Sequence, residues 1–141
     1  DIADTLVGVD LSENMVSKAK QKNIYDELYV DDIIDKIESL NVAFDLYISA
    51  DVFVYIGELR PLFQCIRKHF NEKSLFIFST ELYDKEGYTL RKTGRYAHSK
   101  GYIQSLADDV GFRLAYFTQS NLRKDKNEWI VGGIYLLKGG G

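Results

Sequence analysis

Short apolar runs alternate with stretches of helical periodicity through the first part of the chain. The apolar runs have the length of strands and predict four of them, over Thr5–Asp10, Glu27–Asp31, Phe44–Ala50 and Ser74–Thr80. The stretches between them gather apolar residues on one side and predict helices, from Ser12 to about Lys22, over Asp32–Leu40 and over Glu58–Phe70. This alternation is typical of a mainly parallel sheet with helices on both faces.

The second part of the chain has a different pattern. Leu82–His98 has no clear period and is rich in charge, so we expect a long surface loop there. Ser99–Val110 predicts a helix, with a serine cap at its start and a glycine directly after its end. The remaining residues predict an antiparallel pair, with strands over Phe112–Gln119 and Glu128–Leu137 and a polar hairpin loop over Ser120–Asn127. The fold class is therefore α/β, with a mostly parallel sheet that ends in an antiparallel hairpin.

Composition narrows the class of protein. The 141 residues suit one domain, which we expect to span residues 1–138 and to leave the glycines 139–141 as a tail. A formal net charge of −3 gives no broad basic field, and no apolar run approaches the ~20 residues that span a bilayer, so neither nucleic acid nor a membrane is expected as a partner. The single cysteine, Cys65, favours a reducing, cytoplasmic setting, and we predict no metal site.

Acidic residues lie at the ends of three predicted strands. Asp10 ends the first strand, Asp32 follows the second, and Asp51 follows the third. The carboxyl ends of parallel strands border the crevice in which α/β sheets bind ligands, and a carboxylate there can accept hydrogen bonds from both hydroxyls of a ribose. The alternatives are a solvated acid for Asp10 and Asp51 and a helix N-cap for Asp32, with Asp31 as a competing candidate for the same site.

Four segments resemble the class I S-adenosylmethionine-dependent methyltransferases, in the order and at the spacing of that family. They are Val7–Met15, Tyr29–Ile33, Phe44–Tyr55 and Ser74–Glu81. A further segment, Arg95–Ser99, is similar to a bacterial subgroup that includes tetratricopeptide-repeat-associated methyltransferases. The resemblance implies a Rossmann-like sheet, S-adenosylmethionine as cofactor, and methyl transfer to an oxygen or nitrogen of a small molecule.

The resemblance also implies residues that hold the cofactor. It places the ribose on Asp10, the adenine between Asp32 and the Ile33 N–H, and the methionine part beside the third strand. The full set of implied cofactor contacts is Asp10, Leu11, Met15, Asp32, Ile33, Ala50, Asp51 and Val52. A methionine at the helical spacing of Met15 is also an ordinary core residue.

Candidates for catalysis and acceptor binding lie after the third and fourth predicted strands and at the end of the long loop. His98 and Asp51 are the catalytic candidates, because a histidine near neutrality can accept a proton from the acceptor. Tyr55, Glu81 and Tyr96 are the candidates for substrate binding, and the loop that ends at His98 is expected to cover the site. The alternatives are a solvated histidine and half-buried core tyrosines.

Basic side chains are concentrated in and just after the long loop. Arg91, Lys92, Arg95 and Lys100 form a cluster that would suit an anionic substrate group or RNA. A solvated loop in an acidic protein is the favoured interpretation.

The first strand of the methyltransferase family and its glycine-rich turn are not found in these residues, because only four residues precede the first predicted strand. In the family's strand order, 3-2-1-4-5-7-6, that strand is central. We therefore expect an N-terminally truncated sheet that a lost N-terminal segment, a partner such as a second copy of the chain, or a rearrangement completes. The alternatives to methyl transfer are a non-catalytic interaction module derived from this fold and a domain that binds another nucleoside.

Overall fold

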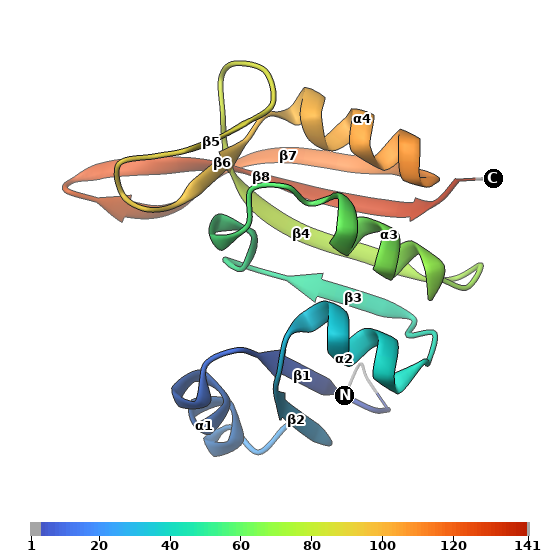
Figure 1. Ribbon diagram of the computed structural model, residues 1–141. Coiled ribbons are helices and arrows are strands. Elements are labelled where there is room, and N and C mark those ends of the chain that lie inside the picture. The colour runs from blue at the N-terminus through green and yellow to red at the C-terminus, as the bar shows by residue number, and fades with distance from the viewer. Residues whose placement is uncertain (1–3, 141) are drawn as a thin grey trace. The chain divides into compact units, whose positions relative to one another are not determined.

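The computed structural model describes residues 4–140, and its contacts divide the chain into two compact units (Figure 1). The N-terminal unit comprises residues 1–42 and the C-terminal unit residues 43–141. The sequence predicts a single domain over 1–138. Among the described residues each unit has its own sheet, because β1 and β2 of the N-terminal unit pair only with each other.

The N-terminal unit consists of two strand–helix pairs: β1 (Val7–Asp10), α1 (Glu13–Gln21), β2 (Glu27–Val30) and α2 (Ile33–Leu40). The strands pair in parallel, with Asp10 opposite Val30. Both helices begin at the predicted caps. The Ser12 hydroxyl accepts a hydrogen bond from the Met15 N–H (3.3 Å), and the Asp32 carboxylate accepts one from the Asp35 N–H (3.0 Å).

The C-terminal unit contains the other elements. They are β3 (Leu46–Ser49), the short 3-10 helix η1 (Phe53–Tyr55), α3 (Arg60–Lys68), β4 (Leu75–Leu82), β5 (Tyr88–Leu90), β6 (Tyr96–His98), α4 (Lys100–Val110), β7 (Phe112–Asp125) and β8 (Glu128–Gly139). Their strands form one six-stranded sheet in the order β5-β6-β4-β8-β7, and β3 also pairs with β4. The pairings β3–β4 and β4–β6 are parallel, and those of β4–β8 and β7–β8 are antiparallel.

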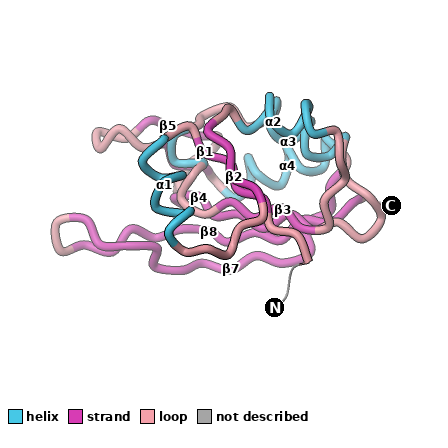
Figure 2. The backbone as a smooth tube through the Cα atoms, turned by 90° about the horizontal axis from the view of Figure 1, so that it is seen from below, coloured by secondary structure: helices cyan, strands magenta, loops and turns pink. Residues whose placement is uncertain are grey.

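The core of the C-terminal unit is a cluster of aromatic rings between the sheet and its helices. Phe76 and Phe78 on β4 meet Phe63 on α3, with ring centroids 5.5 and 5.4 Å away, and Phe53 and Phe112 close the cluster. Helices α3 and α4 lie side by side and on the same side of this sheet (Figure 2). The sequence predicts helices on both faces, whereas both helices of this unit cover one face.

The side chains of strand β3 are more exposed than its sequence predicts. Its apolar sequence predicts a strand covered on both faces, but Leu46 is 43% and Ile48 67% exposed. The reason lies in the pairing, because β3 has only β4 as a neighbour in the sheet, and its outer edge carries no strand among the described residues.

The long loop predicted over Leu82–His98 contains a hairpin. β5 and β6 pair in antiparallel fashion, and β6 continues the sheet beside the end of β4. Strands of three residues are too short to give a visible period in the sequence, so the pattern alone predicts a loop.

The closing hairpin is longer than the sequence predicts. β7 runs to Asp125, through most of the predicted loop, and only Lys126 and Asn127 form the turn, with φ of 51° and 68°. At the other end Gly139 pairs with Phe112, and the Gly140 N–H donates to the Gly111 carbonyl (2.7 Å). The ordered hairpin therefore extends into the predicted tail. Gly141 lies outside the described residues.

No helix within residues 4–140 is long and apolar enough to cross a membrane.

Candidate functional site

In the N-terminal unit, Asp10 lies at the carboxyl end of β1 as predicted. One oxygen of its carboxylate accepts a hydrogen bond from the Ser12 N–H (2.8 Å), which fixes the turn into α1. The neighbouring strand is held in register, because the Asp31 N–H donates to the Asp10 carbonyl (3.0 Å). The second carboxylate oxygen of Asp10 has no hydrogen-bond partner within the described residues, so it is available to accept from a ligand.

The two acids after β2 have different local partners. Asp31 accepts a hydrogen bond from the Asp32 N–H (2.8 Å) and lies 3.6 Å from the Lys36 ammonium. Asp32 is the N-cap of α2, and its side chain is exposed, so capping and ligand binding are compatible. Since Lys36 partly neutralises Asp31, Asp32 is the better acceptor for a ligand. Ile33 is the first residue of α2, where backbone N–H groups have no partner within the helix.

Two predicted apolar contacts, Leu11 and Met15, lie on the turn after β1 and on α1. Both side chains are exposed. The interpretation of Met15 as a core residue is therefore wrong for this unit, whose α1 is anchored instead by the buried Val16.

In the C-terminal unit, residues 50–52 follow β3. Asp51 adopts a left-handed conformation with φ of 56°, which is uncommon outside glycine but tolerated by aspartate. Its N–H donates to the Ser79 hydroxyl on β4 (3.4 Å), and its carboxylate pairs with the Arg123 guanidinium (3.2 Å). Ala50 is exposed and Val52 half-buried.

Glu81 lies near the carboxyl end of β4 and is 1% exposed. Its carboxylate faces three guanidinium groups. Arg91 donates to Oε1 (2.9 Å), Arg123 pairs with Oε2, and Arg95 is 3.9 Å from Oε2. A buried carboxylate needs partners of this kind, since an unpaired one is strongly unfavourable.

Arg123 joins two predicted site residues, because it contacts both Asp51 and Glu81. Arg123 is not among the site residues predicted from the sequence, because it falls in the stretch that the sequence predicts to be a hairpin loop. A signal was present: Asn127 readily adopts a left-handed turn, and a two-residue turn at 126–127 extends β7 through position 123.

His98 lies on β6, and its ring is fully buried. The ring Nε2 is 3.0 Å from the Gly57 carbonyl oxygen, which can only accept, so Nε2 carries the proton. Burial lowers the pKa of His98, which favours the neutral ring. The Nδ1 atom has no hydrogen-bond partner within the described residues.

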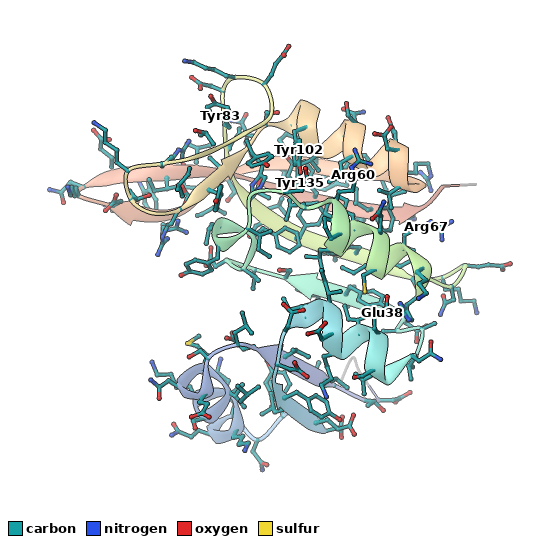
Figure 3. All side chains as sticks on the ribbon, in the orientation of Figure 1. Glu38, Arg60, Arg67, Tyr83, Tyr102 and Tyr135 are labelled. Carbon is teal, nitrogen blue, oxygen red and sulfur yellow. The ribbon has the colours of Figure 1, made fainter. Side chains whose placement is uncertain are left out.

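The tyrosines around this region differ in exposure. Tyr55 on η1 is exposed, whereas Tyr96 is half-buried with its ring 6.1 Å from that of Tyr88. Tyr102 on α4, labelled in Figure 3, accepts from the Leu59 N–H (3.0 Å) and donates to the Glu58 carboxylate (2.9 Å). Burial raises the pKa of Tyr102 to about 12, so it stays protonated near neutrality.

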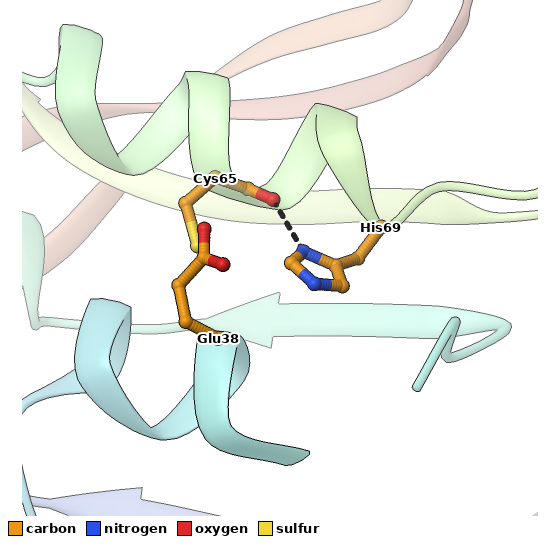
Figure 4. Close-up of side chains that lie close together, drawn as sticks. All are labelled: Glu38, Cys65 and His69. Atoms are coloured by element: carbon orange, nitrogen blue, oxygen red, sulfur yellow. Dashed lines mark hydrogen bonds between the residues drawn. The ribbon is translucent and has the colours of Figure 1, made fainter. Parts of the chain in front are cut away.

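The second histidine belongs to the α3 packing. The His69 Nδ1 is 2.9 Å from the Cys65 carbonyl oxygen, one helical turn earlier (Figure 4). Both residues are buried. Figure 4 also draws Glu38, which belongs to the N-terminal unit.

A family model described as a methyltransferase domain matches residues 1–78, which is more than half of the chain. The chain belongs to this methyltransferase family. The resemblance of the sequence to methyltransferases is thereby confirmed. No match was found among curated proteins.

The methyltransferase domain is also similar in fold to solved structures. An S-adenosylmethionine-dependent methyltransferase from Methanosarcina mazei has a TM-score of 0.73 at 13% identity, over 96% of this chain and 82% of that one. One from Clostridium acetobutylicum has a TM-score of 0.70 at 21% identity, over 98% and 76%. The N-methyltransferase NodS from Bradyrhizobium japonicum, in complex with S-adenosyl-L-homocysteine, has a TM-score of 0.74 at 17% identity, over 96% and 66%. The predicted Rossmann-like α/β fold is confirmed.

Proposed function

We propose that the chain binds S-adenosylmethionine and takes part in methyl transfer to an oxygen or nitrogen of a small molecule. The observation that carries this proposal is the pair of acids at one end of the parallel strands β1 and β2, Asp10 and Asp32, in a member of a methyltransferase family. The bound S-adenosylhomocysteine of the similar NodS structure adds support for the cofactor class.

The residues of the N-terminal unit fit a nucleoside. Asp10 keeps one carboxylate oxygen for the ribose hydroxyls, because only the other oxygen is used by the Ser12 N–H. Asp32 caps α2 with one oxygen, which leaves the second to accept from the adenine amino group, and the Ile33 N–H is suited to donate to the ring. Leu11 and Met15 offer exposed apolar surface for the adenine.

The residues of the C-terminal unit fit the reacting end. We assign Ala50, Asp51 and Val52 to the methionine part, and Tyr55, Glu81 and Tyr96 to the acceptor side, with Glu81 acting through the arginines that surround it. S-adenosylmethionine supplies a methyl group already activated on a sulfonium. The chain then has mainly to hold the acceptor in line and exclude water, and such positioning supplies on the order of 7–11 kcal/mol in the best cases.

A base is required only for an acceptor that is protonated at the working pH. Asp51 is exposed beside the proposed methionine segment and is the better placed of the two catalytic candidates. A proton-accepting role for His98 stays a prediction, and it requires the buried ring to become accessible to the acceptor.

Calorimetric titration of S-adenosylhomocysteine tests the proposal. We expect binding to the chain and a loss of affinity of about tenfold or more in Asp10→Asn, because a hydrogen bond to a charged group is exchanged for one to a neutral amide. Asn keeps an oxygen for the Ser12 N–H, so the turn is retained. Asp108→Asn, an exposed acid on α4, is the matched control and should bind as the wild type does.

Absence of binding to the wild-type chain would contradict the proposal, and equal binding by Asp10→Asn would contradict the ribose assignment. A cytoplasmic location and a second copy that completes the sheet stay predictions from the sequence.

A further inference from the structure

The C-terminal unit contains a pocket of about 300 Å³ beside the Glu81 cluster, which consists of Glu81 and the three arginines that surround it. Three segments far apart in the sequence line it: the end of β4, the turn between β5 and β6, and the tip of the β7–β8 hairpin. The lining residues are Glu81, Thr93, Arg95, Arg123, Lys124, Asp125 and Ile130. A volume of this size is at the lower end of small-molecule sites, which run from roughly 300 Å³ upward.

The three arginines of the cluster are not equally engaged. Arg91 uses two nitrogens, on Glu81 and on the Leu82 carbonyl (both 2.9 Å). Arg123 uses its two terminal nitrogens on Asp51 and Glu81. The Arg95 guanidinium has one ion pair of 3.9 Å and donates no hydrogen bond within the described residues, while 35% of its side chain is exposed. Since a guanidinium has five N–H donors, Arg95 retains most of its capacity to donate hydrogen bonds to a ligand.

The charges that a ligand would meet in this pocket are mainly positive. Glu81 is buried under the guanidinium groups, so its carboxylate is covered and its single charge is shared among three cations. Lys124 adds a further cation at the rim, with its ammonium 5.1 Å from the centre of the Trp129 ring. Asp125 is the one carboxylate of the lining that is not covered in this way.

Guanidinium groups are planar forks that match the two oxygens of a carboxylate or phosphate. We propose that this pocket binds the oxyanion group, carboxylate or phosphate, of a small organic anion through the guanidinium fork of Arg95, with the positive charge of Arg123 beside it. That this anion is the methyl acceptor rests on the proposed function. The link is Arg123, which also pairs with Asp51 in the segment assigned to the methionine part.

The test uses three probes that share a phenyl ring, benzoate, phenyl phosphate and the neutral benzamide, titrated into the whole chain and followed by NMR. We expect an anion, and not benzamide, to shift the arginine side-chain resonances of Arg95 and Arg123, with affinity that falls as salt rises. Preference for benzoate or for phenyl phosphate distinguishes a carboxylate from a phosphate ligand.

Variants locate the binding. Arg95→Gln should lower anion affinity about tenfold or more, since hydrogen bonds to a charged group are removed. Arg95→Lys keeps the charge but not the fork and should recover only part of the affinity. Arg113→Gln removes an exposed arginine at the other end of β7 and should leave affinity unchanged. Thermal melts of each variant verify that it is folded.

The proposal is overturned if neither anion binds, if benzamide binds as well as they do, or if Arg95→Gln binds them like the wild type. S-adenosylhomocysteine is titrated into the same samples to separate the two proposals. If S-adenosylhomocysteine binds and the anions do not, the pocket proposal is contradicted and the methyl-transfer proposal is not. If the anions bind and S-adenosylhomocysteine does not, the pocket proposal is supported and the methyl-transfer proposal is contradicted.

Discussion

The two units use acids at strand ends in opposite ways. In the N-terminal unit, Asp10 and Asp32 are bound by backbone N–H groups two and three residues further along the chain, and each keeps an oxygen for another partner. In the C-terminal unit, Asp51 and Glu81 are bound by guanidinium groups, with Arg123 separated from them by 72 and 42 residues. The same sequence pattern therefore yields acids available to a ligand in one unit and acids that organise cations in the other.

Removal of the charge on Glu81 is the most severe test of this contrast. We expect Glu81→Gln to lower the free energy of unfolding by about 3 kcal/mol, because it leaves three guanidinium groups around a neutral amide in a buried position. Glu86→Gln, an exposed acid in the loop before β5, should change it by less than about 0.5 kcal/mol. Denaturant unfolding measures both. Equal stability of the two variants would mean that the arginines do not depend on Glu81.

The pH dependence of stability tests the buried histidine. Because the pKa of His98 is lowered in the folded chain, the unfolded chain binds more protons, and this group's contribution is lost as the pH falls below its usual pKa of 6.5. His98→Gln can still donate to the Gly57 carbonyl but does not titrate. Below pH 6.5 we expect the free energy of unfolding of His98→Gln to decline less steeply than that of the wild type. Above pH 7 the two free energies should vary with pH in the same way. Identical slopes below pH 6.5 would show that the ring is not held neutral.

Capping and ligand binding by Asp32 can be separated with two variants. Asp32→Ala should destabilise the chain by about 1 kcal/mol, because the Asp35 N–H loses its acceptor. Asp32→Ser restores the cap without the carboxylate and should recover that stability. Both variants should bind S-adenosylhomocysteine more weakly than the wild type. Full binding by Asp32→Ser would leave the residue with a capping role alone.

The smallest effect is expected at Asp51. Its pair with Arg123 is largely exposed on the aspartate side, and such pairs contribute up to about 1 kcal/mol. Asp51→Asn preserves the left-handed backbone, which asparagine tolerates, so unfolding experiments should show a loss below that value. A loss as large as that of Glu81→Gln would mean that the two acids form one indivisible network.

The sequence predicts those features that depend on neighbours along the chain. The caps at Ser12, Asp32 and Ser99 and the glycine stop at Gly111 follow from residue type and spacing, and all four are confirmed. The places of Asp10 at the end of β1 and of Asp51 after β3 follow from the ends of apolar runs.

Features that depend on residues far apart in the sequence could not be predicted from it. The three-residue strands β5 and β6 form because they extend an existing sheet edge, and nothing in their own sequence requires it. The arginines around Glu81 come from the β5–β6 hairpin and from β7, so their meeting depends on the register of β8 with both β4 and β7. Burial of His98 likewise depends on its contact with the Gly57 carbonyl, 41 residues away.

The most direct measurement is an NMR map of the backbone amides as S-adenosylhomocysteine is added to the chain. We expect the largest shifts on Leu11 and Ser12 after β1, on Asp32 and Ile33 after β2, and on residues 50–52 after β3. Shifts confined to the surroundings of Arg95 and Arg123, or none at all, would contradict this expectation.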